Sequence, residues 1–372
     1  MGCKFAHIAD VHVQEEDFEE ISSCMENIFQ ICKKEEISFS IIAGDLWDRK
    51  LWSHSVCFRN TVDWIIRLAS LGPVYIIYGT PSHDTPGSLS IFERILTQHP
   101  IYVAARPTVW KENIEGDIFD IAALPHIEIA PQGDLAKTIT TRQAGVLKLV
   151  ENLYENCSGK YKIFVGHLAI TGCVIPQGTD GYEIDAKFLS RFDYAALGHV
   201  HPQNQDLPPN VQYSGSIWHL DTGDVSPKGF NIVTLDKTGV SKKFYNAGSH
   251  PVVKFSNTFS ETFDLLPIKD DVREAKVRYT MYVPSRFREA FDAEAYKQSI
   301  LNLGAYECKV IVRILQEDIE VVDFGYTRSV QEGNWLDKFR AYCESVEIEV
   351  TDSMLEKVSK LIEEVSLTGI EE

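Results

Sequence analysis

The first 200 residues contain five short apolar runs, at residues 5–9, 39–43, 74–78, 163–165 and 194–197. Each run has the length of a buried strand and leads into a polar tip that carries a carboxylate or an imidazole. In an open α/β sheet, parallel strands deliver their C-terminal ends to one crevice. The pattern therefore predicts an α/β protein whose polar tips converge.

Helices are predicted between these strands. Apolar residues recur at three- and four-residue steps over residues 15–36 and cover much of the surface over 55–71. A short helix is predicted at 88–99 and another at 144–156, with a strand at 117–124. The excess apolar face of the second and third helices is expected to be covered either within the monomer or by a second copy of the chain.

The later part of the chain predicts a closing hairpin and a small α/β unit. The hairpin pairs 230–235 with 241–245 across a turn that contains Gly239. The α/β unit consists of a strand at 277–283, a helix at 290–303 and a strand at 309–315.

The C-terminal segment follows a polar linker at 325–333. Helices are predicted at 335–343 and 352–365. The second has an apolar stripe that needs a partner, made of Met354, Leu355, Val358, Leu361, Ile362 and Val365.

Composition narrows the class of protein. A length of 372 residues predicts two or three domains. The eight cysteines are scattered and the sequence shows neither a signal peptide nor a membrane-spanning run, so we expect a cytoplasmic protein without a membrane contact. The net charge of −18 argues against a general nucleic-acid binder. The acidic residues are unevenly distributed, however, because residues 343–372 contain nine Asp and Glu and only two Lys.

Candidate metal ligands occupy the polar tips. Imidazole and carboxylate are good ligands for Mn, Fe and Zn. We expect six side chains to converge, enough for two ions with one carboxylate between them: Asp10, His12, Asp45, His167, His199 and His201.

The order of these motifs resembles a known family. Asp-x-His at 10–12, Gly-Asp at 44–45, His-Asp at 83–84, Gly-His at 166–167 and Gly-His-x-His at 198–201 are similar to the calcineurin-like metallophosphoesterases. Within them the chain resembles the SbcD-type nuclease subunits of DNA double-strand-break repair complexes from bacteria or phage. Residues 213–216 (Tyr-Ser-Gly-Ser) and 228–230 (Lys-Gly-Phe) also look like that branch.

The resemblance implies an architecture and partners. It implies a four-layer αββα sandwich at 1–250, a small α/β capping domain for DNA at 251–325 and a helical segment at 326–372. That last segment would bind an SMC-like ATPase subunit of the SbcC type. Two divalent metal ions, in this family Mn(II), and a homodimer are also implied.

The resemblance further implies residue roles. Asp45 would bridge the two ions; Asp10, His12 and His201 would complete the first site, and His167 and His199 the second. His83 would donate to the phosphate or protonate the leaving oxygen, and Asp84 would orient it. The loop Asp48, Arg49 and Lys50 lies beside the metals and is a candidate substrate contact.

One motif departs from the family. The pattern Gly-Asn-His-Asp/Glu supplies an asparagine amide oxygen to the second metal, but this chain has Thr80-Pro81-Ser82 between Gly79 and His83. Either Ser82 reaches the metal or water fills the position. The second site is therefore expected to bind more weakly.

Three functions remain compatible with the sequence. The first is a two-metal DNA nuclease with 3′–5′ exonuclease and single-strand endonuclease activity, coupled to an ATPase. The second is a phosphatase or small-molecule phosphodiesterase on the same fold. The third is a regulatory subunit whose second metal site has weakened, which the change at Ser82 favours.

Overall fold

The computed structural model describes residues 2–114, 116–127, 135–173, 183–203, 205–260, 272–315, 354–355 and 357–359. The predicted linker at 325–333, the predicted helix at 335–343 and most of the one at 352–365 lie outside the described residues.

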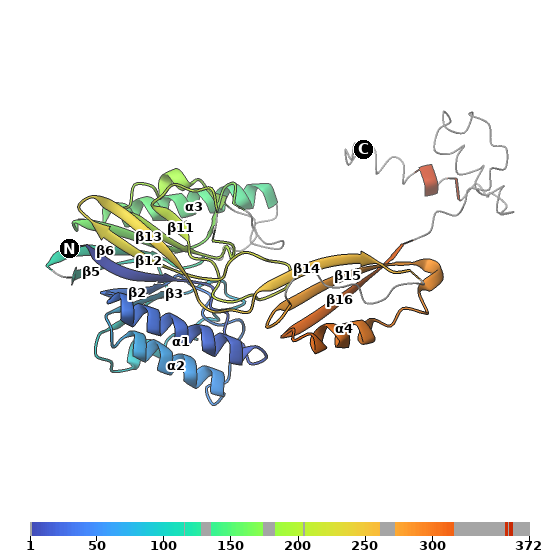
Figure 1. Ribbon diagram of the computed structural model, residues 1–372. Helices are drawn as coiled ribbons and strands as arrows, with labels where there is room; N and C mark the ends of the chain where they lie inside the picture. Colours follow the sequence, from blue (N-terminus) through green and yellow to red (C-terminus); the bar gives the residue numbers. More distant parts are fainter. Residues whose placement is uncertain are drawn as a thin grey trace. The chain divides into compact units, whose positions relative to one another are not determined.

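Two mixed sheets form the centre of the fold (Figure 1). The first is ordered β13-β12-β1-β2-β3-β4. Its strands are β1 (Cys3–Ile8), β2 (Phe39–Ile42), β3 (Val74–Ile77), β4 (Ile101–Ala104), β12 (Gly229–Asp236) and β13 (Gly239–Asn246). The second is ordered β11-β10-β7-β6-β5. Its strands are β5 (Thr108–Ile114), β6 (Asp117–Leu124), β7 (Tyr161–His167), β10 (Tyr194–Gly198) and β11 (Val211–Tyr213). A separate short pair joins β8 (Ala169–Ile170) to β9 (Glu183–Ile184).

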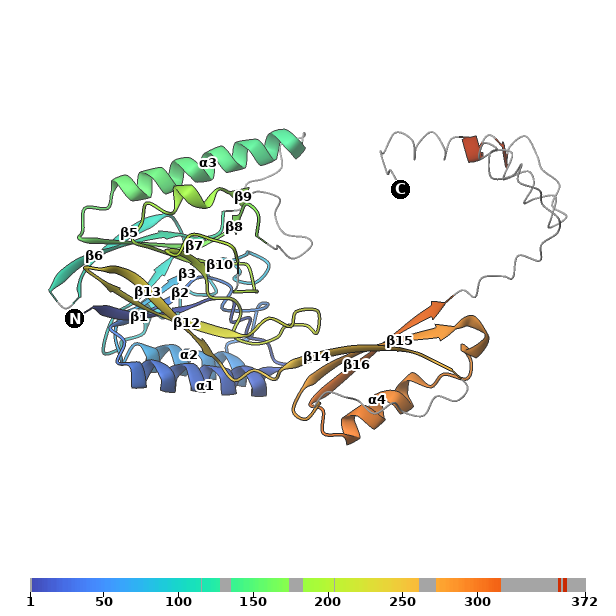
Figure 2. The same ribbon diagram turned by 45° about the horizontal axis from the view of Figure 1, so that its top comes forward.

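Helices cover the outer faces of the two sheets. Helices α1 (Phe18–Glu35) and α2 (Val56–Leu68) lie on the first sheet, and α3 (Leu135–Glu155) lies on the second (Figure 2). Alternation along β1 builds the layers, since Phe5 packs between the sheets whereas Ala6 and Ile8 pack under α1 and α2. The expected four-layer αββα sandwich is confirmed.

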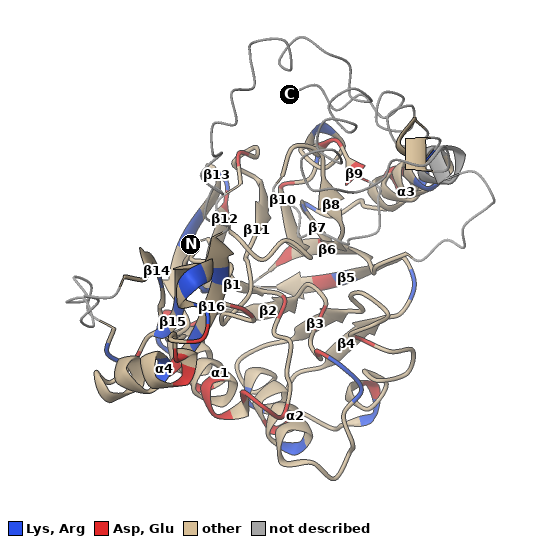
Figure 3. Ribbon diagram, turned by 90° about the vertical axis from the view of Figure 1, so that its right-hand side faces the viewer, with Lys and Arg blue, Asp and Glu red and all other residues tan. Residues whose placement is uncertain are grey.

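The ends of the first two helices follow from local sequence. The Ser55 hydroxyl caps α2 by accepting from the Phe58 amide at 3.3 Å. Glu36 ends α1 in a left-handed conformation, with φ of 52°. Figure 3 shows acidic positions at the N-terminal end of α1, where the helix dipole favours them.

The predicted helix at 88–99 is wrong. Only a single 3-10 turn, Phe92–Arg94, forms there, and Ile95 is already extended. Gly87, with φ of 86°, precedes this stretch and Pro100 follows it. Backbone hydrogen bonds between them run to the third preceding residue, as from Phe92 to Leu89 and from Arg94 to Ile91, so separate turns form in place of an α-helix. The helix predicted at 144–156, in contrast, begins nine residues earlier, at Leu135.

The predicted hairpin is confirmed. Strands β12 and β13 pair antiparallel, and Asp236 faces Gly239 across a two-residue loop. Gly239 has φ of 123°, a backbone conformation that residues with a Cβ atom rarely adopt.

A third sheet is ordered β14-β15-β16. It consists of β14 (Val252–Thr258), β15 (Lys276–Pro284) and β16 (Glu307–Leu315), with helix α4 (Ala293–Asn302) between the last two. The predicted strand, helix and strand are present, whereas β14 was missed. Its side chains are only partly buried and it lacks an apolar run.

The chain divides into two compact units, one of Met1–Tyr282 with Glu289–Arg313 and one of Val283–Arg288 with Ile314–Glu372. The boundaries at 250 and 325 stay predictions. Among the described residues, no helix is long and apolar enough to cross a membrane.

Candidate metal centre

Polar side chains gather at the C-terminal ends of strands from both central sheets. Asp10 follows β1, Asp45 follows β2, His167 ends β7, and His199 with His201 follows β10. The strands β7 and β10 pair in parallel, with Gly198 beside His167. The structure thus brings together the six side chains that the sequence pattern groups.

The backbone at this edge is strained. Asp10, His12, Asp45 and His199 have φ of 50°, 45°, 50° and 97°, in a region that residues other than glycine rarely occupy. Such conformations persist where surrounding contacts fix them, and they concentrate at functional sites. Here the Asp10 amide donates to the carbonyl of Gly44 at 3.1 Å, and the His12 amide donates to that of Asp45 at 3.0 Å.

Two glycines allow the strand ends to approach one another. A Cβ on Gly44, whose φ is 89°, would lie 2.4 Å from His167 Nδ1. A Cβ on Gly79 would lie 2.1 Å from Asp45 Oδ1. Larger residues at these positions would therefore push apart the groups that form the centre.

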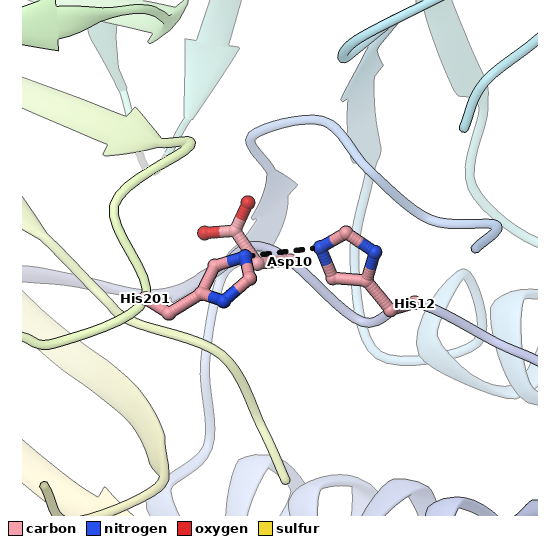
Figure 4. A group of neighbouring side chains, drawn as sticks. All are labelled: Asp10, His12 and His201. Atoms are coloured by element: carbon pink, nitrogen blue, oxygen red, sulfur yellow. Dashed lines mark hydrogen bonds between the residues drawn. The ribbon is translucent and has the colours of Figure 1, made fainter. Parts of the chain in front are cut away.

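The first cluster consists of Asp10, His12 and His201, whose side chains point toward one another in Figure 4. Their ligand atoms lie within 4.8 Å of one another, and His12 Nε2 is 3.2 Å from His201 Nε2. Burial raises the pKa of Asp10 to about 6 and holds the pKa of His201 well below its usual value. A neutral imidazole is the form that binds a metal.

Asp45 stands between the first cluster and the second, which is built from His167 and His199. Its Oδ2 lies 3.2 Å from His167 Nε2 and 3.6 Å from His12 Nε2. Burial opposes ionisation of Asp45, but the positive charge of His167 and its hydrogen bond hold the pKa of the carboxyl below its usual value. A carboxylate in this position can face an ion on each side.

The second cluster is oriented by backbone groups. His167 Nδ1 lies 2.9 Å from the Ala43 carbonyl, which leaves Nε2 facing Asp45. A backbone partner of this kind sets the tautomer of metal-ligating histidines. The ring of His199 lies 5.1 Å from that of His167, and the His199 amide donates to Asp10 Oδ1 at 2.9 Å.

Thr80 is a site residue that the sequence reasoning missed. Its amide donates to Asp45 Oδ1 at 2.6 Å, and its hydroxyl lies 3.4 Å from Asp45 Oδ2 and 3.3 Å from His167 Nε2. Ser82, which we expected either to reach the second metal or to leave that position to water, is exposed. Counting forward from Gly79 would have found Thr80; counting back from His83 selected Ser82.

His83 and Asp84 differ from the expected arrangement. His83 Nδ1 lies 2.5 Å from the Asp48 carbonyl, so Asp48 orients the ring. Asp84 is buried and instead accepts from the amides of Gly79, Leu46 and Trp47 at 2.9, 3.3 and 3.1 Å. It ties together the two loops that carry His83 and Asp48. The ring of His83 lies 4.6 Å from that of His12, so His83 does reach the centre.

The basic loop is exposed beside these groups. The Arg49 guanidinium lies 3.4 Å from Glu16 and 3.5 Å from Asp48, which leaves it partly neutralised. Lys50 lines a cavity of about 460 Å³. The other lining residues are Trp47, Leu51, Phe58, Thr85, Pro86, Gly87 and Ser88.

His126 is a second residue that the sequence reasoning missed. Its ring lies 6.1 Å from the rings of both His167 and His199. It follows β6 as the other tips follow their strands, so the same strand-then-polar-tip rule could have found it.

The donor set fits a pair of divalent ions. Two overlapping groups of ligand atoms share Asp10, namely Asp10, His12 and His201, and Asp10, Asp45 and His167. A third group, His12, Asp48 and His83, lies beside them. Mixed imidazole and carboxylate ligands suit Mn, Fe and Zn.

Comparison with known proteins places this geometry in a family. The model of the calcineurin-like phosphoesterase family matches residues 3–203. The SbcD component of the SbcCD nuclease of Staphylococcus saprophyticus is 24% identical over 258 residues, which cover 65% of this chain and 68% of the relative. The corresponding SbcD protein of Staphylococcus epidermidis is 23% identical over 250 residues, covering 63% and 66%.

A third relative covers more of the chain. The DNA double-strand break repair protein Mre11 of Archaeoglobus fulgidus is 24% identical over 340 residues, which cover 86% of this chain and 67% of that protein. The chain thus spans about two thirds of the length of each of these three relatives. With a family model that covers more than half of its length, this chain belongs to the calcineurin-like phosphoesterases.

Proposed function

We propose that this chain is a two-metal DNA nuclease, the nuclease subunit of an SbcCD-like repair or processing complex. The observation that carries the proposal is the convergence of Asp10, His12, Asp45, His167 and His201 on one buried centre at the sheet edge. The relatives named for the SbcCD nuclease and as Mre11 support DNA as the substrate.

The chain's own residues divide into binding and proton-handling roles. Asp10, His12 and His201 would hold one ion, His167 and His199 the other, and Asp45 would contact both. When bound, two such ions would lower the pKa of a water at the site and offset the charge of the reacting phosphate. Because Mn(II) accepts oxygen and imidazole ligands, we propose it as the metal.

His83 would serve the leaving group. Its Nδ1 faces the Asp48 carbonyl at 2.5 Å, which leaves Nε2 available to a phosphate or a sugar oxygen. Proton donation by a positioned imidazole contributes roughly 10²–10⁴-fold to a rate. Lys50 is exposed in the loop that contains Asp48, and it would contact the DNA backbone.

The proposal extends to partners and domains. The segment 251–325 would act as a capping domain over DNA. Residues 326–372 would bind an SMC-like ATPase, and two copies would form a homodimer in the cytoplasm. A net charge of −18 supports dependence on a partner for DNA binding, since DNA affinity rests on lysine and arginine.

One observation favours a second candidate, a regulatory subunit with a weakened second site. Thr80 follows Gly79, as asparagine follows glycine in the family motif, and its hydroxyl lies 3.3 Å from His167 Nε2; a hydroxyl is a poorer ligand than an amide oxygen. A phosphatase or phosphodiesterase of the same fold is a third.

Digestion of end-labelled linear DNA with Mn(II), beside bis-p-nitrophenyl phosphate and p-nitrophenyl phosphate, separates the three. We expect cleavage of DNA and of the diester. Hydrolysis of the monoester alone would indicate a phosphatase. An inactive protein that still binds a partner ATPase would indicate a regulatory subunit.

A further inference from the structure

A buried tryptophan holds the segment between two ligands of the first cluster. The Trp218 side chain is 1% exposed, and its indole Nε1 donates to the carbonyl of Val11 at 2.9 Å. Val11 lies between Asp10 and His12, which both have left-handed backbones. Since residues other than glycine hold such conformations only where surrounding contacts fix them, the turn needs such contacts.

The contacts on this turn come from two sides. The amides of Asp10 and His12 donate to carbonyls of Gly44 and Asp45, at the end of β2. The Val11 carbonyl is held by Trp218, from the connection between β11 and β12. The indole is therefore the side-chain anchor of the turn that presents Asp10 and His12.

Lys276 lies over the ring of this tryptophan. Its ammonium is 4.7 Å from the centroid of the Trp218 ring, and it donates to the carbonyl of His219 at 3.1 Å. Lys276 is the first residue of β15 and is 3% exposed. A desolvated cation is attracted to the face of an indole ring more strongly than an exposed one.

Glu20 of α1 neutralises this lysine. Its Oε2 lies 2.7 Å from Lys276 Nζ. Its Oε1 accepts from the hydroxyl of Ser249 at 2.8 Å and from the amide of His250 at 3.0 Å. A buried pair with these extra hydrogen bonds fixes the start of β15, α1 and the entry to β14 in one place.

We infer that Trp218 is a positioning residue for the first metal site, and that Lys276 with Glu20 connects it to the three-stranded sheet. The inference rests on the proposed function, because it assigns Trp218 a role in holding ligands of the proposed first ion. It follows that the affinity of this site depends on how β15 is anchored.

Trp218→Phe tests the first part, because it keeps an aromatic ring and removes the N–H donor together with part of the indole; a control must therefore lose the same ring volume without losing a hydrogen bond. Trp64→Phe is the matched control. Trp64 is 2% exposed, and its Nε1 has no hydrogen-bond partner among the described residues. Mn(II) is titrated calorimetrically into the metal-free full chain, and the melting temperature of each metal-free protein is measured beside it.

We expect Trp218→Phe to bind Mn(II) at the tight site about 3- to 10-fold more weakly, the effect of one lost hydrogen bond. Trp64→Phe should bind as the unmodified chain does. Equal affinities in the two variants would overturn the inference while leaving the proposed function intact. Absence of Mn(II) binding by the unmodified chain would overturn the proposed function, and the inference with it.

Glu20→Gln combined with Lys276→Met tests the connection and does not depend on the folding of Trp218→Phe. Both charges are removed together, so neither is left buried and unpaired. We expect Mn(II) affinity at the tight site to fall by about 2- to 5-fold as the cation–π contact is lost. Lys276→Arg, which keeps a cation over the ring, should retain the affinity. Unchanged affinity in the double variant would overturn the link to the three-stranded sheet.

Discussion

The two halves of the metal centre are built differently. In the first half, Asp10, His12 and His201 match the family motif residue by residue, and backbone hydrogen bonds hold the turn that carries Asp10 and His12. In the second half, His167 and His199 lie at the ends of strands. The ligand that the family motif supplies from asparagine falls in the loop 79–84, where this chain has two more residues than the motif. Ligands at strand ends are fixed by the sheet, whereas a loop can change its contribution.

The difference has a chemical consequence. Thr80 hydrogen bonds to Asp45 and lies 3.3 Å from His167 Nε2, but it offers a hydroxyl instead of an amide oxygen. The second ion would therefore have one weak ligand in the isolated chain. A phosphate oxygen from DNA could complete it, which would make occupancy of the second site depend on substrate.

The largest effect should come from Asp45, which stands between the two halves. Asp45→Ala should abolish metal-dependent cleavage, because Asp45 faces both His12 and His167. Cleavage of labelled DNA and binding of Mn(II) would be measured together. Asp120→Asn is the control, since Asp120 is equally buried and accepts from the Ser158 and Gly159 amides outside the centre. Full activity in folded Asp45→Ala would refute a two-metal mechanism.

His83 lies beside the first half without completing it. For His83→Ala we expect turnover to fall roughly 10²–10⁴-fold with metal content unchanged, as for loss of a general acid. Single-turnover rates and metal analysis would test this. Because His12, Asp48 and His83 also form a group that could hold an ion, loss of metal would make His83 a ligand.

The loop 79–84 gives a direct test of the weaker half. Thr80→Val keeps the shape and removes the hydroxyl that would be the weak ligand, so the second ion should bind about 10-fold more weakly, the lower end of the loss expected when a group at a metal site is removed. Ser82→Ala, at an exposed position, should bind both ions unchanged. The opposite ranking, measured by Mn(II) titration, would return the ligand role to Ser82.

The smallest effect is expected at the basic loop. Lys50→Ala should leave both metal affinities unchanged. It should reduce the slope of the logarithm of DNA affinity against the logarithm of salt concentration by about one unit. Arg49→Ala should change it less, because Arg49 already pairs with Glu16 and Asp48. Equal slopes for Lys50→Ala and the unmodified chain would exclude Lys50 from the DNA surface.

The ends of the buried strands could be predicted from sequence. Each apolar run is followed by its polar tip, and burial on both faces makes such a strand readable without the structure. Asp10, Asp45 and His167 were found in this way, and His126 follows the same rule.

The rest depended on contacts that sequence spacing does not reveal. The insertion in 79–84 allows two registers, and only the fold shows Thr80 beside Asp45. The resemblance implied that Asp84 orients His83, yet Asp84 accepts from the amides of Leu46 and Trp47, in another loop. Trp218 acts on Val11 across 207 positions of sequence, which no local pattern indicates.

Mn(II) titration by calorimetry, with and without a non-cleavable DNA, measures the two halves separately. With the free chain we expect one tight site, formed by Asp10, His12 and His201 together with Asp45. With DNA bound, a second tight site should appear as phosphate completes the half that contains His167 and Thr80. Two equally tight sites without DNA would contradict the difference between the halves, and no tight site in either condition would contradict the metal centre itself.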